Sequence, residues 1–314
     1  MAESITLDQI DRGLVHALTI DGRVPFSLVG ELLGVSEHTV ARRYRRLRAY
    51  GVLRVVGVVN GLRLGRRSWT IRIRCTPEAA GPIATALARR ADTYWIHILS
   101  GGTEISCNCQ PASDEQLLID KLPRSVDVTA HELLPGSTRP PRWAAIEQLS
   151  VAQTARLQRP EPTDEEIVLE PPDHQLLQHL AVDGRATYAQ LAPVTGWSTS
   201  TVARRLDQLR RTGVLGFEVE LPPSALGYRA EARLWMSVRP TDLVETVDVL
   251  TEHPEISFTA VTTGPTNLVA HTICRDSAHL YRYLTERIGA LPGINTLETA
   301  PVLRTIKAFQ TPLP

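Results

Sequence analysis

Cysteine is scarce in this sequence, and its arrangement argues against two kinds of structural cross-link. Four cysteines occur in 314 residues, at positions 75, 107, 109 and 274, and no two of them form a C-x-x-C pair. We therefore expect neither a disulfide framework nor a zinc site, and a reducing cytoplasm fits this usage. Cys107 and Cys109 fall on the same side of one predicted strand, where we interpret them as small buried hydrophobic residues rather than metal ligands.

An excess of one charge and a long apolar run are also absent. Lys+Arg and Asp+Glu both number 34, so the formal net charge is zero and binding of a polyanion would need a local basic patch. No apolar run approaches the ~18–20 residues of a membrane helix. We predict a soluble cytoplasmic protein without a membrane partner. No pattern in the sequence indicates a catalytic group, a bound metal or a cofactor.

What the sequence does contain is a long internal repeat. The pentapeptide T-V-A-R-R begins at residue 39 and again at residue 201, 162 positions later. The D-G-R triplets that begin at 21 and 183 and the L-G pairs that begin at 64 and 226 have the same offset. This period is domain-sized and exceeds the 20–50 residues of solenoid repeats. The chain is predicted to be one module duplicated in tandem.

The start of each copy has the pattern of three short helices. In the first copy, apolar residues recur at helical spacing over residues 7–18, and Thr6 is the expected cap of this helix. Ser27 is the expected cap of a second helix that ends at Gly34. In the second copy Pro193 falls inside the corresponding helix, which we expect it to kink or shorten.

The third helix of each copy is the expected DNA-reading element, and we call it the reading helix. In the first copy Ser36 is its expected N-cap and Gly51 its left-handed end, while Val40, Tyr44 and Leu47 form one apolar face. A tight glycine turn joins the second and third helices, and a valine-rich strand follows at 55–60. Together these elements predict a winged helix-turn-helix.

Each helix-turn-helix is followed by strands and helices in the order βαββαβ. The first copy has predicted strands at 69–75, 94–99, 105–109 and 126–134, with helices at 77–90 and 113–122. The second has strands at 230–238, 256–261, 268–273 and 294–303, with helices from 240 and over 276–288. This order predicts a ferredoxin-like, four-stranded antiparallel sheet with helices on one face and a second face that needs a partner.

The predicted fold class is α+β, with two winged helix-turn-helix domains and two ferredoxin-like domains. We predict the helix-turn-helix domains at residues 1–65 and 172–227 and the ferredoxin-like domains at 66–135 and 228–314. Residues 136–171 are the predicted linker, with one possible helix over 143–157. The length of the linker allows the two copies to pack side by side.

Arginine is concentrated on the reading helices. The first carries five arginines within residues 42–48, whereas the second has Asp207 and Gln208 in place of Arg45 and Arg46. Arginine suits guanine and phosphate contacts, and the helix N-terminus normally reaches the base edges. We predict double-stranded DNA as the partner, stronger phosphate binding by the first helix, and two similar but non-identical half-sites. The predicted DNA-binding residues are Ser36, His38, Thr39, Arg42, Arg43, Arg46, Ser198, Thr199, Ser200, Thr201, Arg204 and Arg205.

These motifs resemble the Lrp/AsnC, or feast/famine, family of bacterial and archaeal transcription regulators. The family's ordered set, D-G-R, V-x-R-R, L-x-x-x-G-V-I/L and L-G, is matched at 7–65 and again at 172–227, and residues 263–303 resemble its effector domain. The resemblance implies a transcriptional regulator. Because a typical member carries one such module and dimerises through its sheet domain, it also implies an intramolecular pseudo-dimer that assembles further into homo-oligomers.

The resemblance also implies a small-molecule effector, with an amino acid as the first candidate. Family effectors bind near a turn of approximate pattern G-x-Y/F-D, and the matching segments here are 101–104 and 264–267, both without the aromatic residue. Glu104 keeps an acid for an α-ammonium group and Asn267 does not, so the two sites are expected to differ. The predicted effector-binding residues are Gly101, Thr103, Glu104, Gly264, Thr266 and Asn267. The alternative is that both segments are simple tight turns.

Two other functions share this pattern. Sirohaem decarboxylases resemble the same module and occur as fused pairs, but their His-Asn-Tyr strand is not matched at residues 94–97 or 256–259. Their reading helices also need no basic face, which this chain has, and we therefore expect no enzymatic activity. A DNA-architectural protein without a ligand would bind with little sequence preference and a steep salt dependence.

Overall fold

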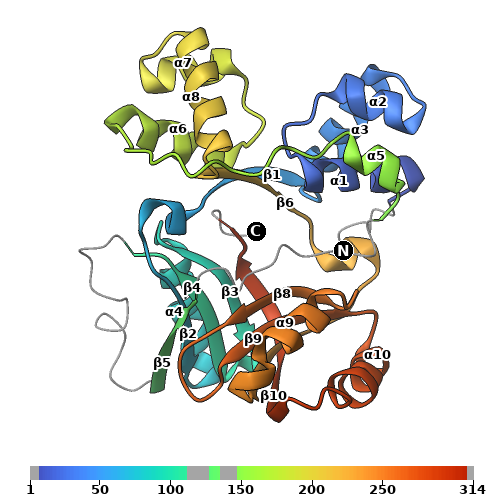
Figure 1. Cartoon of the computed structure of the whole chain (residues 1–314), viewed down its shortest axis with the longest axis vertical. Coiled ribbons are helices and arrows are strands. Elements are labelled where there is room, and N and C mark those ends of the chain that lie inside the picture. The colour runs from blue at the N-terminus through green and yellow to red at the C-terminus, as the bar shows by residue number, and fades with distance from the viewer. Residues whose placement is uncertain (1–6, 112–126, 135–146, 310–314) are drawn as a thin grey trace. The chain divides into compact units, whose positions relative to one another are not determined.

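The computed structural model describes residues 7–111, 127–134 and 147–309, and its contacts divide the chain into two compact units (Figure 1). The helical unit takes the described residues within 1–65, 146–226 and 309–311. The sheet unit takes those within 66–145 and 227–308. Each unit therefore combines the corresponding parts of both sequence copies. The five predicted domain ranges remain a prediction about how the chain divides in sequence.

The helical unit contains two three-helix bundles of the same plan. The first bundle consists of α1 (Gln9–Ile20), α2 (Phe26–Leu33) and α3 (Glu37–Ala49), followed by the strand β1 (Arg54–Val59). The second consists of α6 (Pro171–Val182), α7 (Tyr188–Thr195) and α8 (Thr199–Arg211), followed by β6 (Leu215–Glu220). The predicted apolar face of the first reading helix is confirmed, because Val40, Tyr44 and Leu47 are all buried. A short helix, α5 (Val151–Ala155), lies in the predicted linker.

The strand after each bundle pairs with its counterpart from the other copy. β1 and β6 form a two-stranded antiparallel sheet from Arg54 opposite Glu220 to Val59 opposite Leu215. β1 also packs on α6, and β6 packs on α1. The strand predicted at residues 55–60 is thus confirmed, but each strand joins the two bundles instead of forming a hairpin within its own copy.

Three local predictions in the helical unit are wrong for identifiable reasons. Asp8, not Thr6, caps α1, because Asp8 and Asp11 form a reciprocal capping box; Thr6 itself lies outside the described residues. Ser27 lies inside α2, which begins directly after Pro25. The shortening expected at Pro193 is wrong, because α7 spans the eight positions equivalent to those of α2 and a proline in the last turn removes only one backbone hydrogen bond; the kink, the other expectation, stays a prediction.

The sheet unit contains two halves of the predicted βαββαβ plan. The first half consists of β2 (Ser68–Arg74), α4 (Pro77–Ala88), β3 (Thr93–Leu99), β4 (Glu104–Cys109) and β5 (Asp127–Leu133). The helix predicted at 113–122 lies outside the described residues, as does the start of the linker helix predicted at 143–157. The second half consists of β7 (Ala230–Val238), α9 (Leu243–Thr251), β8 (Ile256–Val261), β9 (Leu268–Cys274), α10 (Ser277–Arg282), a π-helical turn (Tyr283–Ile288) and β10 (Ile294–Lys307).

The two halves join into one eight-stranded antiparallel sheet. Its strand order is β5-β2-β4-β3-β10-β7-β9-β8, in which each half has the ferredoxin-like order and β3 pairs with β10 at the junction. The two outer strands also touch, through a bridge between Leu133 and Thr262 and backbone hydrogen bonds from Leu134 to Val261 and from Thr263 to Glu132. The sheet therefore closes on itself. β10 is longer than predicted because its second half pairs with β3.

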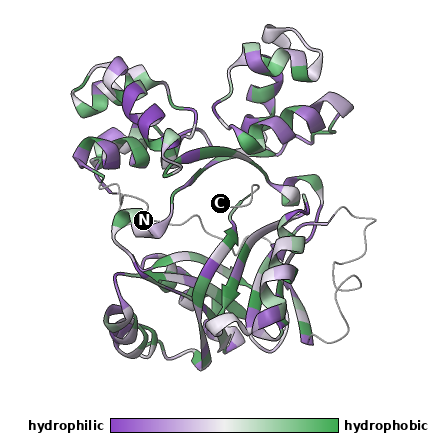
Figure 2. Ribbon diagram, turned by 180° about the vertical axis from the view of Figure 1, so that it is seen from behind, coloured by the Kyte–Doolittle hydropathy of each residue, from purple (hydrophilic) through white to green (hydrophobic). Residues whose placement is uncertain are grey.

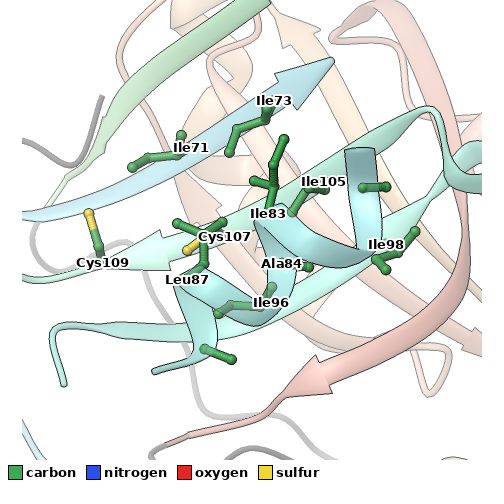
Figure 3. Packing of buried hydrophobic residues seen from close by; sticks show 12 residues of the cluster. Ile71, Ile73, Ile83, Ala84, Leu87, Ile96, Ile98, Ile105, Cys107 and Cys109 are labelled. Carbon is green, nitrogen blue, oxygen red and sulfur yellow. The ribbon is translucent and has the colours of Figure 1, made fainter. Parts of the chain in front are cut away.

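Each half has one face under helices and one face turned toward the other half. Under α4, the strands contribute an apolar cluster that includes Ile71, Ile73 and Ile105 (Figure 3). Cys107 and Cys109 lie in this cluster, which confirms their interpretation as buried hydrophobic residues. On the opposite faces, Leu99 and Leu133 of the first half pack with residues of the second half, including Trp235. The second face of each half is therefore covered by the other copy, and we call the region where these two faces pack the sheet interior.

Candidate nucleic-acid interface and ligand site

The N-terminal tips of the two reading helices, α3 and α8, are exposed and similarly capped. As predicted, Ser36 accepts a hydrogen bond from the Thr39 backbone N–H at 3.1 Å, and Ser198 accepts one from the Thr201 N–H at 3.1 Å. These caps satisfy backbone donors that would otherwise be free at the start of each helix. The exposed residues at the two tips are Ser36, Glu37, His38, Ser198, Thr199 and Ser200.

Three of the predicted DNA-binding arginines pair with carboxylates of their own bundle, although Arg46 stays exposed. Arg43 pairs with Asp8 and Asp11, and Arg46 pairs with Asp11 at 2.6 Å. In the second copy, Arg205 pairs with Asp173 through two contacts of 2.6 and 2.9 Å. The Asp11 and Asp173 side chains are completely buried. These three arginines therefore connect the reading helix to the first helix of the same bundle.

Sequence reasoning missed this pairing, although a signal for it exists. Asp11 and Asp173 are 162 positions apart, so they belong to the same repeat as the pentapeptide. Each lies on the first helix of its bundle, opposite the second arginine of T-V-A-R-R. A repeated acid on a helix face that is otherwise apolar indicates a buried partner of opposite charge.

The first arginine of each pentapeptide faces solvent instead. Arg42 and Arg204 are exposed, and within the described ranges neither forms an ion pair. Arg45, which only the first copy has, is also exposed, and among the described residues its side chain bonds only to the Ala41 carbonyl, at 3.3 Å. The first tip therefore presents two uncompensated guanidinium groups and the second presents Arg204 beside Asp207. Arginine side chains in this arrangement can contact phosphates or guanine edges.

The two D-G-R triplets connect the bundles to each other. Arg23 donates to the carbonyls of Gly184 (2.6 Å) and Ala186 (3.0 Å), and Arg185 donates to those of Gly22 (2.7 Å) and Val24 (3.0 Å). The aspartate of each triplet also pairs with an arginine of the other copy. Arg48 of the first reading helix pairs with Asp183 at 2.8 Å, and Arg210 of the second pairs with Asp21 at 2.5 Å. The triplets and the β1–β6 pairing thus fix the two reading helices relative to each other.

In the first predicted effector turn, the polar groups already have partners. Gly101 has a φ of +69°, and the Thr103 hydroxyl donates to the Ser100 carbonyl at 2.9 Å. The Glu104 carboxylate is buried and accepts two hydrogen bonds from Arg72, at 2.8 and 2.9 Å. An α-ammonium group at Glu104 would therefore compete with a bidentate arginine, which is a strong partner for a carboxylate.

In the second predicted effector turn, the polar side chain has a structural role. The Asn267 amide accepts from the Val238 N–H at 2.8 Å and donates to the Val238 carbonyl at 2.9 Å. The Thr266 carbonyl accepts a hydrogen bond from the Thr262 hydroxyl at 2.7 Å. Gly264 has a φ of +97°, and a Cβ atom at this position would clash with the His131 ring. Both segments are thus tight turns with internal hydrogen bonds, and their effector role stays a prediction.

Other site types are not assembled by the described residues. Within 7–111, 127–134 and 147–309, no three metal-ligating side chains come together. In the same ranges, no helix combines the length and the apolar character that crossing a bilayer requires.

Comparison with known protein families matches both bundles and the second half of the sheet unit. The AsnC-type helix-turn-helix domain matches residues 7–48 and 172–210, and the Lrp/AsnC ligand binding domain matches residues 231–312. The HTH-type transcriptional regulator FL11 of Pyrococcus horikoshii is 32% identical over 136 residues, which cover 43% of this chain and 89% of FL11. The regulator Ptr1 of Methanocaldococcus jannaschii is 31% identical over 136 residues, which cover 43% of this chain and 92% of Ptr1.

A solved structure is also similar over nearly the whole chain. The siroheme decarboxylase NirDL superposes with a TM-score of 0.64, covering 97% of this chain and 94% of NirDL, at 13% sequence identity. At this identity the likeness concerns the fold alone. It nevertheless extends over both copies, whereas the two regulators each match a single module.

Proposed function

We propose that this chain, which belongs to the Lrp/AsnC family of transcriptional regulators, binds an asymmetric DNA operator through two diverged reading helices. We also propose that it responds to a small metabolite. An amino acid is the first candidate for that metabolite. The chain supplies both halves of the reading unit, and we expect such chains to assemble further into homo-oligomers.

The reciprocal contacts of the D-G-R triplets are the observation that carries this proposal. They hold the exposed tips of α3 and α8 in one fixed arrangement, with Arg42 and Arg204 directed to solvent. A rigid pair of reading helices selects one spacing between half-sites, usually one helical turn of DNA or a multiple of it. Because the two tips carry different residues, the two half-sites are expected to differ in sequence.

Footprinting and gel-shift titration on DNA from upstream of the chain's own gene would test the proposal. Arg42→Ala and Arg204→Ala should each weaken specific binding by roughly 1–3 kcal/mol, because each removes a base or phosphate contact. Arg89→Ala, an exposed arginine at the end of α4, is the matched control. A footprint confined to one half-site and unchanged by Arg204→Ala would contradict the proposal. Equal competition by unrelated DNA would favour a DNA-architectural protein instead.

The effector response needs a separate test. We propose that calorimetric titration with the standard amino acids detects binding, and that the bound amino acid changes affinity for the operator. Glu104→Gln would weaken binding if Glu104 receives the α-ammonium group. No heat with any amino acid would remove the amino-acid part of the proposal and leave DNA binding unaffected.

A sirohaem decarboxylase remains the second candidate, because the likeness to NirDL extends over nearly the whole chain. Against it stand the unmatched residues at 94–97 and 256–259 and the exposed arginines on the reading helices. Incubation with sirohaem, followed by absorption spectroscopy and product mass analysis, distinguishes the two functions. Loss of carboxyl groups from the tetrapyrrole would establish the enzyme and overturn the expectation of a regulator without catalysis.

A further inference from the structure

The sheet interior contains a group of polar side chains that the proposed function does not use. Hydrophilic segments are interspersed among hydrophobic ones along the strands of this unit (Figure 2). In the strand pairing, Thr70 lies opposite Asn108 and Arg233 lies opposite His271. These residues alternate with those buried under the helices, so they share the interior face. Side-chain atoms without a hydrogen-bond partner occur there on Thr70, Ser106, Asn108, Arg233, Trp235 and His271.

Donors predominate among these unpartnered atoms, and the His271 Nδ1 is the exception because it can accept a hydrogen bond when Nε2 carries the proton. The Arg233 Nε, the Asn108 Nδ2 and the Trp235 Nε1 can only donate a hydrogen bond, and the Ser106 and Thr70 hydroxyls can donate one as well. All five residues are at most 2% exposed. Buried donors without an acceptor are costly, so a concentration of them points to a ligand that carries acceptors.

Arg233 supplies a fixed positive charge at the centre of this group. Its guanidinium donates to the Asn108 Oδ1 at 3.2 Å and lies over the Phe258 ring at 5.1 Å, but it forms no ion pair with any residue the structure describes. Burial lowers the pKa of Arg233 to about 10, which leaves it charged near neutral pH. A buried guanidinium normally has an anionic partner.

The neighbouring carboxylates have other partners. Arg72 pairs with Glu104 and Glu298, and the His271 Nε2 lies 3.3 Å from the Glu231 carboxylate. His97 stacks on His271 at 5.1 Å, and burial, together with the nearby His271 and Arg233, holds the pKa of His97 well below its ordinary value, so it adds no charge near neutral pH. Among the residues that the structure describes, Arg233 therefore has no anionic partner of its own.

We infer that the sheet interior binds a small monocarboxylate, with its carboxylate on Arg233 and Asn108 and its apolar part against Trp235 and Phe258. The site is asymmetric, because the first half places Thr70 and Asn108 where the second half places Arg233 and His271. None of its four proposed contact residues lies in the turns at 101–104 and 264–267, and the first turn adjoins the site through Arg72, which pairs with Glu104 and lies over the Trp235 ring at 5.2 Å. Its regulatory meaning rests on the proposed function, but the binding itself does not.

Thermal unfolding and calorimetry of the full chain, without DNA, test this inference. Acetate, pyruvate and benzoate are the probes, acetamide and benzamide are uncharged controls, and inorganic phosphate tests for a general anion site. At least one carboxylate should raise the unfolding temperature, because ligands that bind only the folded state stabilise it. The amides and phosphate should not. No shift with any carboxylate, or a larger shift with phosphate, would overturn the inference.

Arg233→Met separates a binding arginine from a structural one. The substitution keeps the length of the side chain and removes an unpaired buried charge, so the ligand-free chain should unfold at the same or a higher temperature. Carboxylate affinity should fall at least about tenfold, as expected for the loss of a charge-assisted hydrogen bond. Arg239→Met, at an exposed arginine, is the control. An Arg233→Met chain that binds carboxylate as tightly as the parent would refute the assignment.

Failure of this inference can be told apart from failure of the proposed function. Operator binding by the unchanged chain without carboxylate depends on the helical unit and is measured separately by gel shift. If the chain binds its operator but no carboxylate, the interior site is refuted and the regulator stands. If it binds a carboxylate but no specific DNA, the interior site stands and the proposed regulator is refuted.

Discussion

Adjacent arginines in T-V-A-R-R have opposite roles because the helix turns them to different surroundings. Successive residues on an α-helix are about 100° apart, so Arg42 faces solvent while Arg43 reaches Asp8 and Asp11. The same division separates Arg204 from Arg205. The identity of the residue is therefore a poor guide to its function here, and the presence of a buried carboxylate decides it.

Removing the buried Asp173 carboxylate should destabilise the helical unit without changing the exposed residues at the tips of the reading helices. Asp173 accepts two hydrogen bonds from Arg205 and one from the Glu170 N–H, so Asp173→Ala leaves a half-buried guanidinium unpaired and removes an N-terminal cap. We expect a loss of about 2–4 kcal/mol in the free energy of unfolding. Asp207→Ala, at an exposed carboxylate, should change it by less than about 0.5 kcal/mol. Urea titration measures both, and equal effects would contradict the structural role of Asp173.

Stability should also depend on pH through His97. Burial, His271 and Arg233 lower the pKa of His97 well below 6.5, so on acidification the unfolded chain takes up this proton before the folded chain does. The contribution is fully present above pH 6.5 and is lost as the pH falls below it, by up to about 1.4 kcal/mol per pH unit for one proton. Urea titrations from pH 7.5 to 5.0 measure the slope. His97→Gln should make this slope shallower without abolishing it, because burial also lowers the pKa of His16, His131 and His253. His38→Gln, at an exposed tip, should leave the slope unchanged.

At the scale of elements, the connection between the two bundles depends on a close approach of backbone segments. Gly184 donates its N–H to the Val55 carbonyl at 2.8 Å, and a Cβ there would lie 2.9 Å from that oxygen and from the Val56 carbonyl carbon. Only a residue without a side chain fits beside β1 at this point. The glycine of each D-G-R triplet is thus needed for contact between the copies, not for ending a helix.

Gly184→Ala should weaken the β1–β6 pairing and the coupling of the reading helices. Faster hydrogen exchange at the Val56 and Val58 amides would report the loss of pairing. Affinity for DNA with both half-sites should fall toward that for one half-site, because the second contact is no longer pre-positioned. In Gly81→Ala, no atom lies within 4 Å of the added methyl group, so this variant is the control. Unchanged exchange in Gly184→Ala would exclude a role for this close approach.

The sequence predicted the individual elements better than the contacts between the copies. Helical periodicity and the caps Ser36 and Ser198 identified both reading helices, and alternation identified the strands of the sheet unit. The pairing of β1 with β6, the β3–β10 junction and the burial of Arg43 depend on residues more than 30 positions apart. Local patterns carry no information about such partners. The polar group in the sheet interior was missed for the same reason, since Arg233 and Asn108 are 125 positions apart in the sequence.

At the scale of the whole molecule, duplication within one chain allows the two copies to differ in sequence. In a dimer of identical chains, a substitution appears on both sides of the two-fold axis. Here the D-G-R contacts stay reciprocal, while the tips and the sheet interior differ between copies. The contacts that hold the halves together are therefore the same in both copies, whereas several exposed tip residues and several buried residues of the sheet interior differ. This distribution favours an operator whose two halves are not equivalent.

The charge difference between the reading helices allows that asymmetry to be measured. Arg45 and Asp207 occupy equivalent, exposed positions 162 residues apart, so exchanging their charges alters one reading helix at a time. Affinity falls with salt, and Arg45→Ala should make the slope of log affinity against log salt less steep by about 0.9 if Arg45 contacts one phosphate. Asp207→Arg should make this slope steeper by a similar amount. Gel-shift titrations across a salt series on the full operator provide both slopes.

Half-site removal then assigns each effect to one end of the operator. On DNA shortened so that the first half-site and its phosphates are absent, Arg45→Ala should lose its effect while Asp207→Arg keeps its own, and removing the second half-site should give the converse. A two-fold symmetric mode of binding predicts the same response from both shortened operators, because neither helix would be committed to one half. Equal responses would therefore exclude a fixed polarity of the chain on its operator, even if both reading helices contact DNA.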